Sequence, residues 1–478
     1  MLLASVFSKH PAFAILVIAF IPVLAVVGMT LAKSAEKAVV LIVFLVLMYA
    51  PVGAYIRLPS TPHIWKDNVA YIGIVLGAIL NYPQYLIRAR PGSWPQSLIV
   101  VGMFAAVFTS LTNSDSLIYG QQVIVVIPGL RINDGLFMAF TDVLEDLLPF
   151  FVGIAFIRSA ESMRMMHRYV ISMMLVYALL IFVELRMSPQ VHQWIYGYRA
   201  HNQFLQTIRW GGWRPMVFMR HGLQLSLFNF QVLMMSVAML RTKEEPWVFG
   251  RKDLANWKVV TGFLFVLLVL DKSTGAIVYG LAFAPLAYKL SPKNLTRIAA
   301  FLAFMSLSYP IGRAYEIIPT AKVVNTIEDV FGAERAESMK FRFKNEDLLL
   351  EKASQRLWFG WGKYGRQFNY DYLGRQSTTP DGYWIIMLGA RGIFGHLSSF
   401  LMLLWPVFMA FTAMKKIQDK RDQAMIAIFA LMIAVSVFDL IPNGMFNSYP
   451  NFLSGALVGV LQGMKDKGVW SKYDRVLR

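Results

Sequence analysis

The stretch from residue 186 to residue 221 contains arginine but no lysine, aspartate or glutamate. Its arginines are Arg186, Arg199, Arg209, Arg214 and Arg220. A guanidinium group stays charged and offers parallel N–H donors, so this composition indicates two-pronged recognition of phosphate or carboxylate. Histidines and aromatic rings are interleaved: His192, His201, His221, Trp194, Tyr196, Tyr198, Trp210 and Trp213. Such rings suit sugar faces or the membrane interface; the alternative is a loop anchored to lipid headgroups by its arginines and tryptophans.

A second hydrophilic stretch, about residues 312 to 380, mixes both signs of charge. Residues 334–358 predict an amphipathic helix, because apolar side chains recur among the charged ones at Met339, Phe343, Leu350 and Leu357. A helix of this kind can lie flat on a membrane. Gly360-Trp361-Gly362 then interrupts the pattern. A loop of this length between apolar segments usually has a function.

The composition limits the class of protein that holds these two stretches. Of 478 residues, 56% are hydrophobic and only 15% are charged, against about 25% charged in a soluble domain. This excludes a soluble globular protein and a disordered chain, and it predicts an all-α polytopic membrane protein. Lysine and arginine total 46 against 28 acids, which we attribute to basic cytoplasmic loops and not to nucleic-acid binding. The chain has no cysteine, which excludes disulfides and thiolate chemistry.

Apolar runs predict 12 or 13 transmembrane helices, the first of them retained and not cleaved as a signal peptide. They lie near residues 12–32, 38–56, 68–87, 96–112, 135–157, 169–185, 222–240, 258–270, 275–290, 297–311, 383–412, 423–441 and 449–464. Residues 258–290 predict a tight helical hairpin that turns at 271–275. Asp142, Glu145 and Asp146 fall inside one run. They belong either to a proton or cation pathway or, if that span begins at Leu147, to the surface.

The distribution of basic residues predicts the orientation. From residue 158 onward, alternate loops carry the excess of lysine and arginine, which assigns them to the cytoplasm. The two hydrophilic stretches then face the other side, the periplasm of a Gram-negative cell. The chain divides into N-terminal transmembrane helices (1–185), an Arg-rich periplasmic loop (186–221), central transmembrane helices (222–311), a large, partly helical periplasmic loop (312–382) and C-terminal transmembrane helices with a cytoplasmic tail (383–478).

Several short patterns follow one another in a recognisable order. They are Arg214-Pro215, Arg220-His221-Gly222, Lys272-Ser273-Thr274-Gly275-Ala276, Arg342, Arg356-Leu357-Trp358-Phe359-Gly360-Trp361-Gly362, Thr378-Thr379-Pro380-Asp381-Gly382-Tyr383 and Gly392-Ile393-Phe394-Gly395. Over about residues 200–465 the chain resembles the bacterial O-antigen ligase and polysaccharide polymerase superfamily. It departs from the family pattern at Leu357, where proline is frequent, and at Thr274, where arginine is frequent. Asp381 stands where ligases usually carry histidine, which favours a polymerase-like member.

The resemblance implies a GT-C-like membrane glycosyltransferase of the bacterial inner membrane whose active site faces the periplasm. It would transfer a glycan from undecaprenyl pyrophosphate to an acceptor sugar hydroxyl, in exopolysaccharide or O-antigen assembly, without a metal or cofactor. Arginines would receive the leaving pyrophosphate: Arg214, Arg220 and Arg342, with Arg335 and Arg356 in reserve. Asp381, or its rival His221, would orient the acceptor hydroxyl and take its proton.

Each of these residues also has a structural interpretation. Asp381 is a favourable N-cap for a helix that begins near Tyr383. Arg335, Arg342 and Arg356 are placed to form salt bridges with Glu337, Glu346 or Asp347 on a solvated helix face. For His221 the structural interpretation is a hydrogen bond to the backbone at a helix start.

Three other functions stay open. One is an O-antigen ligase that transfers the glycan to lipid A-core. Another is a transporter or flippase of lipid-linked glycans, against which the lack of an internal repeat counts. The third is a non-enzymatic assembly protein. The expected partners are the undecaprenyl-pyrophosphate-linked glycan, the acceptor glycan and the bilayer, with a polysaccharide chain-length regulator or export proteins as candidates and no nucleic acid.

Overall fold

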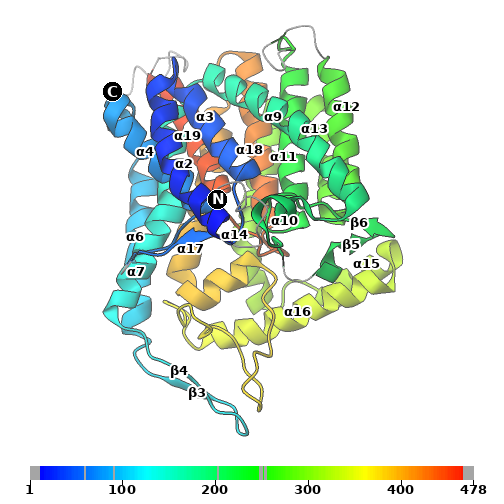
Figure 1. The fold of residues 1–478 in the computed structure, drawn as a ribbon. Coiled ribbons are helices and arrows are strands. Elements are labelled where there is room, and N and C mark those ends of the chain that lie inside the picture. Colours follow the sequence, from blue (N-terminus) through cyan, green and yellow to red (C-terminus); the bar gives the residue numbers. More distant parts are fainter. Residues whose placement is uncertain are drawn as a thin grey trace.

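Helices form most of the computed structural model, which describes residues 11–58, 61–89, 92–201, 204–246, 251 and 256–466 (Figure 1). Seven helices in these ranges are long and apolar enough to cross a bilayer. They are α2 (Ala12–Leu31), α6 (Ser93–Leu111), α9 (Ala160–Met187), α11 (Gly222–Arg241), α14 (Pro292–Ala314), α17 (Tyr383–Ala413) and α18 (Lys420–Phe438). The chain is therefore an all-α multi-pass membrane protein, because a helix satisfies its backbone hydrogen bonds without water.

Shorter helices take the place of the other predicted spans. They are α3 (Ala35–Tyr49), α4 (Lys66–Asn81), α5 (Pro83–Arg88), α7 (Ile132–Asp142), α8 (Leu148–Phe156), α12 (Trp257–Leu270), α13 (Thr274–Lys289) and α19 (Tyr449–Asp466). Over the described ranges seven helices meet the length and hydropathy of a span, and the number of 12 or 13 transmembrane helices stays a prediction. The predicted hairpin is confirmed, since α12 ends at Leu270 and α13 begins at Thr274.

Glycines allow α8 and α19 to pack backbone against backbone. A Cβ atom added at Gly153, Gly455, Gly459 or Gly463 would collide with main-chain atoms of the facing segment. Small residues permit this close approach between membrane helices, where burial of apolar surface gives no driving force. Because its partners bury it, α19 can belong to the bundle without being strongly apolar itself.

The predicted acidic span at 135–157 is interrupted. Residues Val143–Leu147 form a π-helix (η1) between α7 and α8. Asp142 accepts a hydrogen bond from Arg391 at 2.8 Å, and Trp65 Nε1 donates to Glu145 Oε1 at 2.9 Å. Asn451 donates to Asp146 at 2.9 Å. α8 begins at Leu148, close to the alternative start at Leu147, but the acids are half-buried and each is bonded to another helix or loop.

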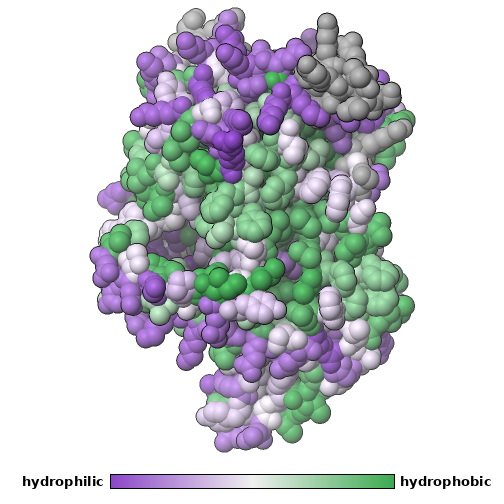
Figure 2. Space-filling model, turned by 180° about the vertical axis from the view of Figure 1, so that it is seen from behind, coloured by the Kyte–Doolittle hydropathy of each residue, from purple (hydrophilic) through white to green (hydrophobic). Residues whose placement is uncertain are grey.

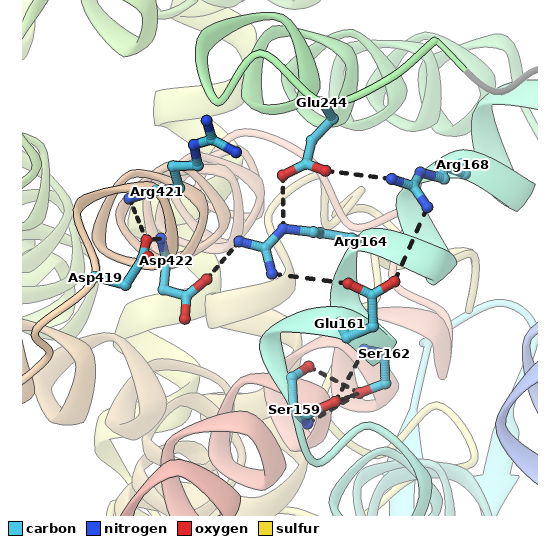
Figure 3. Close-up of polar contacts among 9 residues, drawn as sticks. All are labelled: Ser159, Glu161, Ser162, Arg164, Arg168, Glu244, Asp419, Arg421 and Asp422. Carbon is cyan, nitrogen blue, oxygen red and sulfur yellow. Dashed lines mark hydrogen bonds and ion pairs between the residues drawn. The ribbon is translucent and has the colours of Figure 1, made fainter. Parts of the chain in front are cut away.

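The basic loops assigned to the cytoplasm meet at one end of the bundle (Figure 3). Arg164 of α9 pairs with Glu244, which follows α11, at 2.7 Å and with Asp422 of α18. Arg168 also pairs with Glu244, at 3.2 Å. The prediction that these loops share one side is confirmed. The basic residues Lys252, Lys467, Lys472, Arg475 and Arg478 lie outside the described residues.

The surface agrees with a membrane-embedded bundle. Figure 2 shows a hydrophobic band across the middle of the molecule, with hydrophilic surface above and below it. Leu24, Phe104, Leu179 and Phe301 are exposed apolar residues of the helices α2, α6, α9 and α14. Lipid, and not water, is the solvent that such a band requires.

Short elements and two longer helices cover the end of the bundle opposite to Glu244. The short ones are β1 (Tyr55–Ile56), β2 (Ile64–Trp65), β3 (Leu117–Tyr119), β4 (Val125–Ile127), α10 (Val191–Tyr196), the 3-10 helix η2 (Phe204–Thr207), β5 (Ile208–Arg209) and β6 (Gly212–Trp213), whose strands pair as antiparallel hairpins. α15 (Thr320–Phe331) and α16 (Ala333–Ser354) follow α14. The predicted amphipathic helix at 334–358 corresponds to α16, which ends earlier, and α15 was not predicted.

Two contacts fix α16 below the bundle (Figure 1). Arg313, at the end of α14, pairs with Glu346 at 3.2 Å and with Asp347 at 2.6 Å. Asn345 Oδ1 accepts a hydrogen bond from the backbone N–H of Thr379 at 2.8 Å, which ties the loop before α17 to α16. α16 therefore carries its side chains to a fixed place at the end of the bundle.

Candidate functional site

The structure gathers four arginines from separate segments, and we call Arg209, Arg214, Arg335 and Arg342 the arginine cluster. Arg209 is in β5, Arg214 directly follows β6, and the other two lie on α16. Arg335 and Arg342 are seven positions apart, which places them on one helix face about 10 Å from each other along the axis. Burial lowers the pKa of Arg209, and the nearby positive charges of Arg335 and Arg342 lower it further.

Arg214 is the most deeply placed member of the cluster, with 5% of its surface exposed. Burial lowers its pKa to about 10, and the charges of Arg209 and Arg335 act in the same direction. Among the described residues, the Nε atoms of Arg214 and Arg209 are buried without a hydrogen-bond partner. Both guanidinium groups remain charged at neutral pH. An anion that accepted their hydrogen bonds would relieve the repulsion and the cost of burial.

Carboxyl groups lie at the edge of the cluster. Asp381 Oδ2 is 3.4 Å from Arg342 Nε. Burial raises the pKa of Asp381, and Arg342 opposes the rise. Burial also raises the pKa of Asp439 to about 6 and that of Asp271 to about 8, although Arg342 and Arg214 respectively oppose these shifts. Burial favours the neutral form of Asp271, which makes it a weaker counter-ion for Arg214.

The turn of the α12–α13 hairpin also reaches the cluster. A Cβ atom added at Gly212, in β6, would collide with the Nζ atom of Lys272. The turn residue Gly275 lies against Asp439 Oδ1, with 4.0 Å between that oxygen and an added Cβ. The segment Lys272–Ala276, which carries part of the family resemblance, thus adds a lysine next to β6 and positions Asp439.

His221 forms the N-cap of α11. Its Nδ1 accepts a hydrogen bond from the backbone N–H of Leu223 at 3.1 Å, and its Nε2 lies 3.2 Å from Gln206 Oε1. The first bond leaves the ring proton on Nε2, which then donates to the Gln206 oxygen. Burial lowers the pKa of His221 to about 3, aided by Arg214. The interpretation that His221 bonds to backbone at a helix start is confirmed.

Asp381 is not a helix cap, contrary to the structural interpretation of this residue. The N-cap of α17 is Gly382, and no side chain accepts a hydrogen bond there. Asp381 is about one-third exposed and faces Arg342. Its carboxylate therefore pairs with Arg342 and is still partly accessible to a ligand.

Two of the predicted arginines are not part of the cluster. Arg220 pairs with Asp67, and its guanidinium lies 4.5 Å from the Trp65 ring centroid. Arg356 pairs with Asp115 at 3.0 Å. It lies about 20 Å from Arg342, measured along the direction of α16. Each pairs with a carboxylate that is distant in the sequence, Asp67 in the first turn of α4 and Asp115 before β3, and the sequence does not indicate these partners.

The salt bridges expected on α16 are also different from those observed. Glu346 and Asp347 pair with Arg313, and not with Arg342 or Arg356. Arg342 forms its salt bridge with Asp381, and Arg356 forms its salt bridge with Asp115. α16 therefore has one face bound to the bundle through Arg313 and leaves Arg335 and Arg342 to the cluster.

Sequence reasoning missed the residues that hold the segment between Arg214 and His221. Glu184 of α9 is 1% exposed and accepts hydrogen bonds from the backbone N–H groups of Val191, Met216 and Val217, at 3.1, 2.8 and 2.8 Å. Val217 has φ +51°, a conformation that costs a β-branched residue free energy. The carboxylate stabilises this turn. The available signal was a lone acid inside an apolar run.

A buried lysine supports the same turn from the other side. Lys66 Nζ donates to the carbonyl oxygens of Phe218 at 2.7 Å and Ala50 at 3.0 Å. Tyr177 accepts a hydrogen bond from the Phe218 N–H at 3.1 Å. Desolvation lowers the pKa of Lys66 to about 7. A turn with this many fixed backbone groups gives the arginine that precedes it and the histidine that follows it defined positions.

The site thus consists of four clustered arginines, two of which have a buried Nε atom without a partner among the described residues, together with a partly exposed carboxylate and a rigid support, at the end of the bundle away from the Arg164 network. Across the described ranges, no group of three or more His, Cys, Asp or Glu side chains is placed to hold a metal ion. Comparison with known proteins finds no matching family model, no matching curated protein and no matching solved structure.

Proposed function

We propose that this protein is a polymerase-like membrane glycosyltransferase that moves a glycan from undecaprenyl pyrophosphate to the hydroxyl of an acceptor sugar. The observation that carries the proposal is the arginine cluster, whose buried Nε atoms lack partners and whose charges repel one another. A diphosphate offers several anionic oxygens at the spacing that two or more guanidinium groups require. The proposed location is the periplasmic face of the bacterial inner membrane.

The position of the cluster in the bundle supports a lipid-linked donor. α11 begins at Gly222 beside the cluster and ends at Arg241 beside the Arg164 network, a length of about 30 Å. The cluster therefore lies at one face of the bilayer, where the diphosphate of a polyprenyl carrier would be. Figure 2 shows a hollow with hydrophilic walls at the lower edge of the hydrophobic band, on the side of α12, α13 and α15. Such an opening offers a lateral route for the carrier.

The proposed reaction needs one base and one group of cations. The acceptor oxygen forms a bond with the anomeric carbon of the donor sugar, while the bond from that carbon to the diphosphate oxygen breaks. The acceptor proton passes to the Asp381 carboxylate, and the electron pair of the broken bond leaves on the diphosphate. Arg214, Arg342 and their neighbours stabilise the negative charge that develops there.

Asp381 is a better candidate for the base than His221. Both nitrogens of His221 are engaged, one by Leu223 and one by Gln206, and its pKa of about 3 makes it a very weak base. Asp381 is partly exposed, and burial raises its pKa, which increases its strength as a base. His221 then contributes by holding the start of α11.

Reconstitution with a lipid-linked repeat unit tests the proposal. Purified protein in vesicles should lengthen the glycan and release polyprenyl diphosphate, and Arg342→Ala should reduce the rate by about 100-fold, as loss of a transition-state donor does. Arg375→Ala is the matched control, because this arginine is exposed in the same large loop and its hydrogen bond to Asp371 comes from its backbone.

Three results would count against the proposal. Equal rates for the Arg342→Ala and Arg375→Ala variants would remove the cluster from the reaction. Movement of the lipid-linked glycan across the vesicle membrane without bond formation would indicate a transporter. Transfer only to lipid A-core, with no chain growth, would indicate the ligase alternative.

A further inference from the structure

A large cleft lies at the end of the bundle that is assigned to the periplasm. It has a volume of about 1320 Å³ and lies between the segment before α4, helix α7 and residues 363–364. Its lining includes His63, Trp65, Asn133, Glu145, Lys363 and Tyr364. Sites for single small molecules occupy about 300–1,000 Å³, so this cleft has room for a longer ligand.

The lining combines exposed rings with hydrogen-bonding groups. Tyr364 is 57% exposed, and His63 stacks on Tyr55 with 4.4 Å between ring centroids. Lys363, Asn133 and Glu145 supply donors and acceptors along the same cleft. Sugars have apolar faces that pack on rings and hydroxyls that bond to such groups. The lining also contains apolar side chains, among them Leu136, Phe137 and Phe140. A lipid chain would fit better in the groove of about 610 Å³ between α2 and α3, whose lining is more strongly apolar.

Trp65, which lines the cleft, also contacts Arg220, in the segment between Arg214 and α11. The indole N–H of Trp65 donates to Glu145, and the guanidinium of Arg220 lies 4.5 Å from the ring centroid. Arg220 directly precedes His221, which lies within electrostatic reach of Arg214. In Figure 1, α7 is at the left of the bundle whereas β5, β6 and α15 are at the right. The cleft and the arginine cluster are thus approached from different sides.

We infer that this cleft binds the acceptor glycan as a chain of several sugar residues, an inference that rests on the proposed function. The chain would lie between α7 and the segment before α4, with its reactive hydroxyl toward Trp65 and the cluster. Donor and acceptor then enter from opposite sides and do not compete for one opening. The two aromatic surfaces at Trp65 and Tyr364 give the chain its affinity, and the polar groups orient it.

The absence of cysteine in the chain makes a direct test simple. Asn133→Cys places a thiol on an exposed residue of the cleft, and Gln122→Cys places one on the exposed outer end of the β3–β4 hairpin as a matched control. Each variant is reconstituted and treated with an impermeant polyethylene-glycol maleimide. The probe is polysaccharide released from the producing strain and stripped of lipid. It should slow labelling of Asn133→Cys at least tenfold and leave Gln122→Cys unchanged.

A second measurement uses the polyethylene glycol attached to the cysteine to block the cleft. Modified Asn133→Cys should lose at least 90% of chain elongation and still bind the lipid-linked donor, whereas modified Gln122→Cys should keep both. Equal protection of the two thiols, or elongation unaffected by the block, would overturn the inference. Protection by vesicles of the strain's lipids alone would make the cleft a lipid site and would also overturn it. Failure of the proposed function is distinguishable, because unmodified protein would then show no Arg342-dependent transfer.

Discussion

Arg214 is buried, positively charged and without a partner for its Nε atom, a combination that a folded protein tolerates only when something else stabilises it. The neighbouring turn explains how it persists. Glu184, Lys66 and Tyr177 bind the backbone of Met216, Val217 and Phe218, and these bonds hold the segment whatever occupies the cluster. The arginines therefore stay close together and repel one another in the absence of a ligand, and a bound anion would reduce this repulsion.

Removal of the Glu184 carboxylate should loosen this segment. Glu184→Ala leaves backbone N–H groups of Val191, Met216 and Val217 without an acceptor, at a cost of about 1–3 kcal/mol each. We expect a lower midpoint of thermal unfolding in detergent and at least a tenfold lower rate of transfer. Glu161→Ala is the control, because Glu161 lies on the same helix with 72% of its side chain exposed. Equal melting midpoints for the two variants would contradict this role.

The pH dependence of transfer should report on Asp381. Its carboxylate is the active form, so the rate falls as the pH drops through its pKa, which burial raises above the ordinary value of about 3.9. Arg342 stabilises the carboxylate and holds the pKa down. Arg342→Gln removes that charge, so the acid limb of the normalised residual rate should move to higher pH. Arg342→Lys keeps the charge and should leave the limb near its original position; a limb unchanged in both variants would exclude Asp381 as the base.

Single residues were only partly predictable from the sequence. Arg214, Arg342 and Asp381 were selected, and the structure places Arg342 against Asp381 and Arg214 in the same cluster. Arg220 and Arg356 were selected equally well, because residue type and spacing do not reveal Asp67 or Asp115 as partners. Arg209 is not among the arginines predicted to bind the pyrophosphate. Its neighbour in the cluster, Arg335, is more than 100 positions away in the sequence, so the sequence does not indicate that the two lie close together.

At the scale of elements, two glycine-containing segments pack onto each other. The backbone N–H groups of Trp361 and Gly362 donate to the carbonyls of Gly389 and Ala390 at 2.8 and 3.0 Å. Gly392 has φ +64° inside α17, and a Cβ atom there would collide with the carbonyl of Trp358. The glycine patterns quoted for the resemblance thus have a physical cause. They allow the end of the large loop to lie directly on α17.

Substitution at this contact should be far more harmful than substitution of a glycine elsewhere. Gly392→Ala introduces both a strained φ and a main-chain collision, so we expect a clear drop in the thermal midpoint and in yield. Gly262→Ala in α12 is the control, because a Cβ atom there meets no atom within 4 Å and alanine favours helix by about 1 kcal/mol. Similar behaviour of the two variants would show that the close approach is not required.

Helices were more predictable than their boundaries. The apolar runs located the bundle and the α12–α13 turn, because burial in lipid demands long apolar segments. They did not reveal the π-helix at Val143–Leu147, where acids that bond to Trp65, Arg391 and Asn451 interrupt the regular pattern. Those partners are distant in sequence, so only the folded chain brings them to the acids.

At the scale of the whole molecule, the ion pairs around Arg164 place the loops at 158–168, 241–245 and 419–422 at one end, and the arginine cluster lies at the other. The grouping of these basic loops at one end was predictable, because it depends on the count of basic residues in each loop, and their assignment to the cytoplasm stays a prediction. The assembly of the site was not, since it requires α16 to lie across the end of the bundle.

The orientation has its own test. Ser377→Cys, on an exposed residue of the large loop, should react with an impermeant maleimide in cells whose outer membrane has been permeabilised. Gln418→Cys, on an exposed residue of a basic loop, should react only after lysis. The physical reason is that the bilayer separates the two ends of the bundle. The reverse pattern of labelling would place the arginine cluster in the cytoplasm and would remove the periplasmic mechanism.

The contacts of Arg164 also determine how the protein could move. Its guanidinium joins α9 to the chain just beyond α11 and to the first turn of α18, and little of the side chain is exposed. Displacements among these three helices must therefore be smallest at that end and grow with distance from it. Any widening that admits a bulky isoprenoid would therefore be a splaying of the far end, where the arginine cluster lies.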